Sequence, residues 1–356
     1  MDVLKPTILQ IGNRLYRKNY LKESESYNPE DEQLYSEGPI TDCLDRDELC
    51  DSSLEIVETK RGLSLSLEVP NFFYKFIIGK KGETKRRLET ETHTQILIPK
   101  MGDTHETVVI NGTDRKGVIS AKTRIDVLVD SVRQRQPFTH FLSIPVCTEH
   151  ICKRFEDFKA EVLEKFSGDR GFDASLFQNP KRLHLTLGTL VLLSDADIRR
   201  ATNLLLDCDQ EIIKPTLQDK SLTVQICGLE YMNDDPTEVD VLYAKVQKGE
   251  ACKRLQTIVD YIAEKLCNSG LMKKEYDRVK LHVTVLNTLM RKDPTGIFDA
   301  ARPGTKLRES FDASGILRTF KDFDFGPLFV DSIHLSQRHT TSKSGYYESA
   351  SIIELP

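Results

Sequence analysis

The stretch LHLTL at residues 183–187 recurs almost unchanged as LHVTV at residues 281–285. Both stretches alternate apolar and polar residues, a period of two that predicts a β-strand with its polar side chains on one face. Two near-copies indicate an internal duplication, in which a pseudo-twofold axis would bring both strands to one cleft. The polar residues that would meet there are His184, Thr186, His282 and Thr284.

Two histidines and two threonines in one cleft suit the chemistry of a phosphodiester. One imidazole can remove a proton from the attacking hydroxyl while the other protonates the leaving oxygen, and the ordinary histidine pKa of about 6.5 suits both roles. Threonine hydroxyls can donate hydrogen bonds to phosphate oxygens. This chemistry needs no metal or other cofactor, so none is expected. A single motif would more often be a core histidine beside a good strand former, but two copies favour a site.

The paired motifs resemble the two-histidine (2H) phosphoesterase superfamily, in its ligase and phosphodiesterase branch. The resemblance extends over residues 137–356 and implies a metal-independent phosphodiesterase with His184, Thr186, His282 and Thr284 as its catalytic residues. It also implies RNA ends or 2′,3′-cyclic phosphates as substrates. Which histidine is the acid and which is the base stays open.

A second motif lies upstream, where two glycines bracket two lysines between two predicted short helices. Glycine allows the backbone to approach a ligand closely, and the N-terminus of the following helix directs free N–H groups into the loop. The surrounding bases favour a nucleic-acid backbone as that ligand. The candidate contacts are Gly79, Lys80, Lys81, Gly82, Lys85 and Arg86.

The predicted elements around this loop follow the order βααββα. They are a strand at 63–69, helices from Pro70 and over 83–91, strands at 94–98 and 107–110, and a helix over 115–132. With FIIGKKGET at residues 76–84, this order resembles a type I KH domain over residues 61–134. The resemblance implies a GXXG loop that grips about four nucleotides of single-stranded RNA or DNA. Lys85 stands where that family usually has an apolar residue, which predicts a more polar groove.

The rest of the chain predicts alternating strands and helices. Strands are expected at 141–146, 183–193, 224–229, 239–246, 279–289 and 328–336, with helices over 149–166 and 250–267 and another capped at Ser194. His334 is expected on a solvated face of the last strand. The fold class is therefore α+β: a type I KH domain followed by a pseudo-twofold, two-lobed 2H phosphoesterase domain.

Composition limits the remaining possibilities. The 356 residues carry a net charge of −5, but residues 23–58 hold thirteen acids and one base, so the body of the chain is basic. Residues 1–60 are predicted to be largely disordered, with a partner-docking segment at 3–20. The eight cysteines form no C-x-x-C pair, so neither a disulfide framework nor a metal site is expected. No apolar run approaches the length of a membrane span.

The fusion of the two domains, with NPK at 179–181 and YMNDDP at 231–236, resembles a family of subunits of a nuclear transcription-coactivator complex. The resemblance implies a helicase subunit and single-stranded RNA or DNA as partners, a role in alkylation-damage repair, and a location in the nucleus. Two alternatives to an enzyme remain open. One is a binding module that holds a nucleotide or RNA end without turnover, and the other is a scaffold of the complex.

Overall fold

The computed structural model describes residues 7–11, 14–18, 54–59, 62–100, 107–232, 234–274, 277–291 and 309–356. The chain divides into two compact units, Met1–Arg135 and Gln136–Pro356. Residues 19–53, for which disorder is predicted, lie outside the described residues. The described part of the predicted docking segment forms an antiparallel pair, β1 (Thr7–Ile11) and β2 (Arg14–Lys18).

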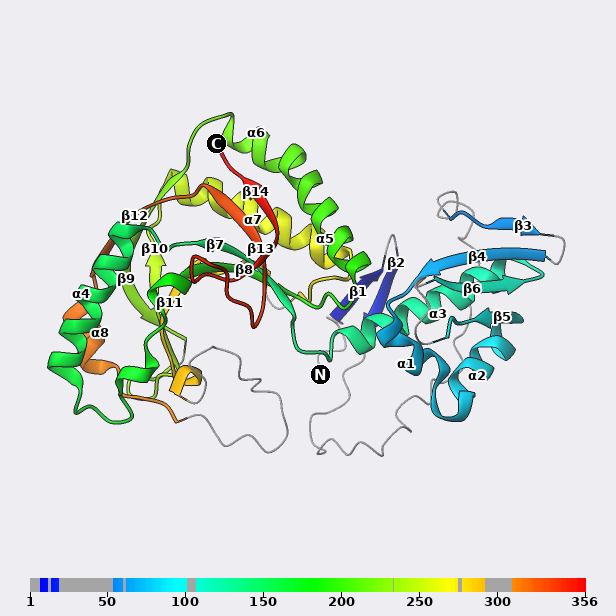
Figure 1. Ribbon diagram of the computed structural model, residues 1–356, viewed down its shortest axis with the longest axis horizontal. Helices are drawn as coiled ribbons and strands as arrows, with labels where there is room; N and C mark the ends of the chain where they lie inside the picture. Colours follow the sequence, from blue (N-terminus) through cyan, green and yellow to red (C-terminus); the bar gives the residue numbers. More distant parts are fainter. Residues whose placement is uncertain are drawn as a thin grey trace. The chain divides into compact units, whose positions relative to one another are not determined.

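The first unit has a four-stranded antiparallel sheet in the order β3-β4-β6-β5. Its strands are β3 (Val57–Thr59), β4 (Gly62–Glu68), β5 (Thr94–Leu97) and β6 (Thr107–Gly112). Three helices pack against the sheet (Figure 1): α1 (Tyr74–Ile78), α2 (Glu83–Thr92) and α3 (Arg115–Arg133). The predicted βααββα order is confirmed. The sheet also contains a strand that was not predicted, β3, which lies before the domain boundary expected at residue 61.

Apolar periodicity explains this unit. In β4 the leucines alternate with serines, and Leu65 is buried. In α3 the residues Val118, Ala121 and Ile125 recur at helical spacing and are completely buried. Helix α3 begins at the Asp114 cap, whose carboxylate accepts a hydrogen bond from the Gly117 amide at 2.8 Å.

The second unit is built on an eight-stranded sheet in the order β12-β9-β10-β11-β8-β7-β13-β14. Its strands are β7 (His140–Pro145), β8 (His184–Leu190), β9 (Thr223–Tyr231), β10 (Val241–Val246), β11 (His282–Asn287), β12 (Asp324–Phe329), β13 (Ser332–Gln337) and β14 (Ser349–Glu354). Its helices are α4 (Glu149–Phe166), α5 (Asp195–Cys208), α6 (Lys214–Leu217), α7 (Glu250–Asn268) and α8 (Ser314–Phe320). Thr148 and Ser194 cap α4 and α5 through their side-chain oxygens.

The sheet consists of two four-stranded halves that meet along a narrow seam. The strands β8 and β11 join at a single ladder pair, Leu185 with Val283. Beyond that pair β11 bridges to Phe177 and β8 bridges to Met272 instead of to each other. Each motif strand is therefore the innermost strand of its own half, with β7 beside β8 and β10 beside β11.

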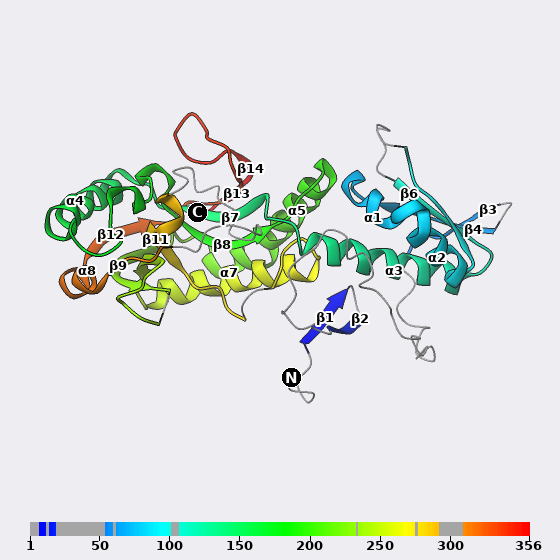
Figure 2. The same cartoon turned by 90° about the horizontal axis from the view of Figure 1, so that it is seen from below.

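The two faces of the second sheet differ. Leu185 and Leu187 of β8 are buried in a core that also takes in the apolar stripe of α7, including Ile258 and Ile262. Figure 2 shows α7 beneath β8, and the segment between β13 and β14 on the opposite side of the sheet. Because side chains alternate along a strand, the motif histidines and threonines lie on the face turned away from α7.

One predicted strand is wrong. The expected strand over 328–336 is two strands, β12 and β13. The buried residues run Leu328, Val330 and then Ile333, Leu335, so the alternation changes phase at Asp331. A strand cannot change phase without turning its side chains to the other face. The strand β14 and the helix α8 were not predicted.

Candidate active site

The seam brings the two motifs together on one face. An antiparallel register that pairs Leu185 with Val283 places His184 opposite Thr284 and Thr186 opposite His282. All four side chains are half-buried, while Leu185 and Val283 between them are buried on the other face. The four predicted catalytic residues therefore form one cluster.

The two histidines make the same hydrogen bond. His184 Nδ1 lies 2.7 Å from the Arg182 carbonyl oxygen, and His282 Nδ1 lies 2.7 Å from the Lys280 carbonyl oxygen. A carbonyl only accepts, so Nδ1 carries the proton in both rings. The nitrogen that can take up or release a proton at the sheet surface is therefore Nε2 in both cases.

Burial makes both imidazoles weak bases. It lowers the pKa of His184 to about 4, against a smaller opposing effect of the Arg182 carbonyl, and the nearby His282 lowers it further. Burial also lowers the pKa of His282, with the Lys280 charge acting in the same direction and the Lys280 carbonyl opposing it. Desolvation disfavours the charged imidazolium, so His184 is neutral at pH 7.

The surroundings of His184 are aromatic. Its ring centroid lies 5.2 Å from that of Phe141, 5.7 Å from that of Tyr347 and 6.4 Å from that of Tyr346. The Tyr346 hydroxyl donates to Ser143 Oγ at 2.8 Å, so the segment between β13 and β14 is fixed against β7. Ser143 is completely buried, which means that this segment covers the face on the β7 side of the site.

The surroundings of His282 are polar. Its ring centroid lies 5.1 Å from that of Tyr243, which stands opposite Thr284 on β10. The Tyr243 hydroxyl donates to Glu230 Oε2 at 2.7 Å, and the Lys245 ammonium lies 3.6 Å from the same carboxylate. Burial and the Glu230 bond raise the pKa of Tyr243, so this hydroxyl remains protonated. No sequence motif marks Tyr243, Tyr346 or Tyr347, so these three residues were not predicted.

His334 does not lie on a solvated face. It is half-buried, and its Nε2 and Nδ1 atoms lie 3.0 Å from Ser332 Oγ and 2.9 Å from Ser349 Oγ. The strand β14, which was not predicted, pairs with β13 and supplies Ser349. Both ring nitrogens are occupied by hydroxyls, so His334 has a structural role.

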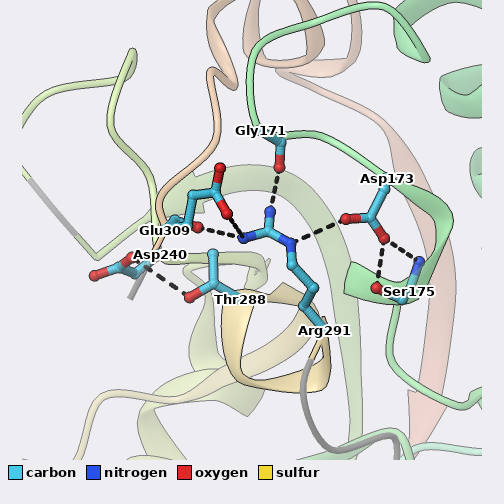
Figure 3. Close-up of polar contacts among 7 residues, drawn as sticks. All are labelled: Gly171, Asp173, Ser175, Asp240, Thr288, Arg291 and Glu309. Carbon is cyan, nitrogen blue, oxygen red and sulfur yellow. Dashed lines mark hydrogen bonds and ion pairs between the residues drawn. The ribbon is translucent and has the colours of Figure 1, made fainter. Parts of the chain in front are cut away.

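At the far end of β11 from His282, a half-buried arginine joins three segments (Figure 3). Arg291 donates to the Gly171 carbonyl, to Asp173 Oδ2 at 2.9 Å and to the Glu309 carbonyl at 2.7 Å. Asp173 in turn accepts the amide of Ser175 at 2.8 Å. The cluster fixes the end of β11 against the loop that follows α4, which is a structural task.

In the first unit the loop between α1 and α2 has the backbone that its glycines predict. Gly79 has φ 69° and ψ 179°, and Gly82 has φ 79°, regions that favour glycine. A Cβ on Gly79 would lie 2.1 Å from Thr84 Oγ1, whereas nothing lies within 4 Å of one on Gly82. The open side of the loop is therefore at Gly82, next to the N-terminus of α2.

The predicted nucleic-acid contacts surround this loop. Lys80, Lys81 and Arg86 are exposed. Lys85 is half-buried and its ammonium lies 3.7 Å from Glu89 Oε1, so it makes an ion pair within α2. The phosphate-binding part of the prediction therefore rests on the exposed cations and on the glycine backbone.

The part of the chain that the structure describes contains no group of three or more histidine, cysteine, aspartate or glutamate side chains that could hold a metal ion. None of its helices is both long enough and apolar enough to cross a membrane.

Fold and site together define a KH domain joined to a 2H phosphoesterase-like domain. Family models agree: residues 64–126 match the KH domain, and residues 138–355 match the AKAP7 2′5′ RNA ligase-like domain. The chain belongs to the AKAP7 2′5′ RNA ligase-like family, and it also carries a KH domain. It is 46% identical over 360 residues to activating signal cointegrator 1 complex subunit 1 of Mus musculus, a match that covers 99% of each protein.

More distant similarities cover single parts of the chain. Uncharacterized protein C15D4.13c of Schizosaccharomyces pombe is 25% identical over 155 residues, which covers 43% of this chain and 68% of that protein. The first KH type I domain of human Vigilin is 30% identical and covers 24% of this chain and 92% of that domain, with a TM-score of 0.21. E. coli LigT complexed with 3′-AMP is 14% identical, covering 62% of this chain and 99% of that chain, with a TM-score of 0.38.

Proposed function

We propose that the chain binds single-stranded RNA or DNA through its GXXG loop and acts as a metal-independent phosphodiesterase through His184 and His282. Its substrates would be RNA ends or 2′,3′-cyclic phosphates. One imidazole accepts a proton from the attacking hydroxyl, the other protonates the leaving oxygen, and Thr186 and Thr284 hold the phosphate oxygens.

One observation carries this proposal. The His–Thr pairs lie opposite each other across the seam, and each histidine has its Nδ1 proton fixed by a backbone carbonyl. A histidine with a purely structural role in the core needs only hydrogen-bond partners for its ring nitrogens, and such a role does not require a second His–Thr motif beside it. A reaction with a general base and a general acid needs two imidazoles that both present Nε2 to the substrate, one neutral and one protonated, and the Nδ1 bonds leave Nε2 available in both rings.

The test uses the purified full chain with end-labelled single-stranded RNA, single-stranded DNA and oligonucleotides ending in a 2′,3′-cyclic phosphate, in EDTA. Products are resolved by mass spectrometry. The His184→Ala and His282→Ala variants are compared with His150→Ala, which removes an exposed imidazole on α4. Product is expected from the wild type and from His150→Ala only.

No product from any of these substrates, with oligonucleotide binding retained, would reject the enzyme and leave a nucleic-acid-binding module. Product from both the His184→Ala and the His282→Ala variants would place the chemistry elsewhere in the chain.

We also propose that the chain is a subunit of a nuclear coactivator complex that contains a helicase and acts in repair of alkylation damage. The similarity to the mouse complex subunit supports this assignment. The test is microscopy of the tagged chain and recovery of its partners, with and without residues 1–20. If the chain is found only in the cytoplasm, the proposed location is wrong. If the same partners are recovered without residues 1–20, the proposed docking role of this segment is wrong.

A further inference from the structure

Each motif histidine is accompanied by the same pair of side chains. Two residues before His184, the Arg182 guanidinium lies over the Tyr347 ring, 4.9 Å from its centroid. Two residues before His282, the Lys280 ammonium lies over the Tyr243 ring, 4.6 Å from its centroid. In both places the tyrosine ring also meets the histidine ring, with interplanar angles of 89° and 64°.

The two tyrosines do not come from equivalent places in the two halves. Tyr243 belongs to β10, which flanks β11, whereas Tyr347 belongs to the segment before β14. The position in the first half that corresponds to β10 is β7. The same cation–tyrosine–histidine arrangement is therefore built twice from different parts of the chain, which is unexpected if it only fills space.

The cations lie on either side of the site. Because β8 and β11 are antiparallel, the residues before His184 and the residues before His282 lie at opposite ends of the seam. Arg182 ends the short 3-10 helix before β8, and Lys280 lies two residues before β11, so the two cations lie at opposite ends of the site. The four motif residues lie between them, and both long side chains can reach inward.

We propose that Arg182 and Lys280 bind the two phosphates that flank the scissile phosphate. The substrate of the 2H site is then a stretch of strand with three consecutive phosphates that runs along the seam, and not an isolated mononucleotide. This inference rests on the proposed function.

The chemistry of the two side chains fits this task. Guanidinium and ammonium groups form charge-assisted hydrogen bonds with phosphate, and a cation stacked on a tyrosine is already oriented, which reduces the entropy lost on binding. Arg182 Nη2 also donates to Thr341 Oγ1 at 2.5 Å, which further restrains it. On the other side, the nearby Glu230 carboxylate is engaged by the Tyr243 hydroxyl and by Lys245.

The test measures binding of a 2′-deoxy dinucleotide by calorimetry, in four forms: without terminal phosphates, with a 5′-phosphate, with a 3′-phosphate, and with both. These ligands are shorter than the roughly four nucleotides that a KH loop grips. Each terminal phosphate is expected to tighten binding to the full-length wild type by at least about 10-fold, the size of one hydrogen bond to a charged group.

Arg182→Gln should abolish the gain from one terminal phosphate, and Lys280→Gln the gain from the other. The controls Lys181→Gln and Arg278→Gln remove a neighbouring charge of the same sign, and both gains should persist. If the wild type shows no gain, or if both gains survive in Arg182→Gln and Lys280→Gln, the inference is overturned. The inference is also overturned if the two control variants lose the gains to the same extent.

The ribonucleotide forms, assayed for product in parallel, separate the two proposals. Gains in binding that depend on Arg182 and Lys280, without product from any ribonucleotide, would support the flanking subsites and reject catalysis. Product formation without these gains would reject the subsites and leave catalysis standing.

Discussion

Acid should weaken the second unit through His184. The pKa of this residue is about 4 in the folded chain and about 6.5 in an unfolded one. Between these values the unfolded chain binds a proton that the folded chain does not, so the free energy of unfolding falls as the pH falls. The difference of about 2.5 pKa units corresponds to at most about 3.4 kcal/mol, of which about 2.5 kcal/mol is lost by pH 4.5.

The measurement compares the wild type with His184→Gln, which keeps a polar side chain but cannot titrate. Because the chain contains no tryptophan, unfolding is followed by urea-dependent hydrogen exchange with mass spectrometry, in peptides from β7 and β8. The wild type should lose about 2.5 kcal/mol more than His184→Gln between pH 7.5 and pH 4.5. Other titrating groups affect both proteins equally and cancel. Equal losses would show that burial does not lower the pKa of His184, and the electrostatic description of the site would be wrong.

Three further predictions concern the two units separately. Since burial lowers the pKa of both His184 and His282, the optimum of kcat/KM for a dinucleotide substrate should lie below pH 6.5; an optimum above pH 7.5 would contradict this. Gly79→Ala should reduce the affinity for single-stranded RNA at least 10-fold, because its Cβ would collide with Thr84. The same collision should destabilise α2 by about 1 to 3 kcal/mol, measured by hydrogen exchange. Gly82→Asn should fold normally, because nothing lies near a Cβ at this position and asparagine tolerates a left-handed φ. Arg291→Met should lower the local free energy of opening of residues 170–176 by about 1.5 to 3 kcal/mol, seen as faster hydrogen exchange. Unchanged exchange there would show that the cluster in Figure 3 does not hold this loop.

The parts of the fold that sequence predicted best are those that local chemistry determines. Helix α4 begins after the Thr148 cap and α5 after the Ser194 cap, because a side-chain oxygen that satisfies free amides marks the start of a helix. The βααββα order followed from periodicity and from the glycines of the loop. The convergence of the two motifs followed from their likeness, since duplicated strands tend to pair around an axis.

The parts that were missed depend on contacts between distant segments. Tyr347 lies against His184 because the segment before β14 is fixed by the Tyr346–Ser143 bond, and nothing near position 347 indicates such a partner. The polarity of His334 looked like that of an exposed residue, but β14 covers it. The edge strand β3 is only three residues long, too short for a period of two to be recognised.

The order of the strands also governs when the site can exist during synthesis. The half that contains β8 takes β7 from its own neighbourhood but takes β13 and β14 from residues 332–354. The strands β9 to β12, which form the other half, lie between them in the sequence. Once both motifs have emerged from the ribosome, the nascent chain can therefore complete the half around His282 first. The half around His184 waits until Ser349–Glu354 leaves the ribosome. A premature stop before β13 would spare both histidines and still abolish the site, and quality control would encounter an open sheet edge at β7.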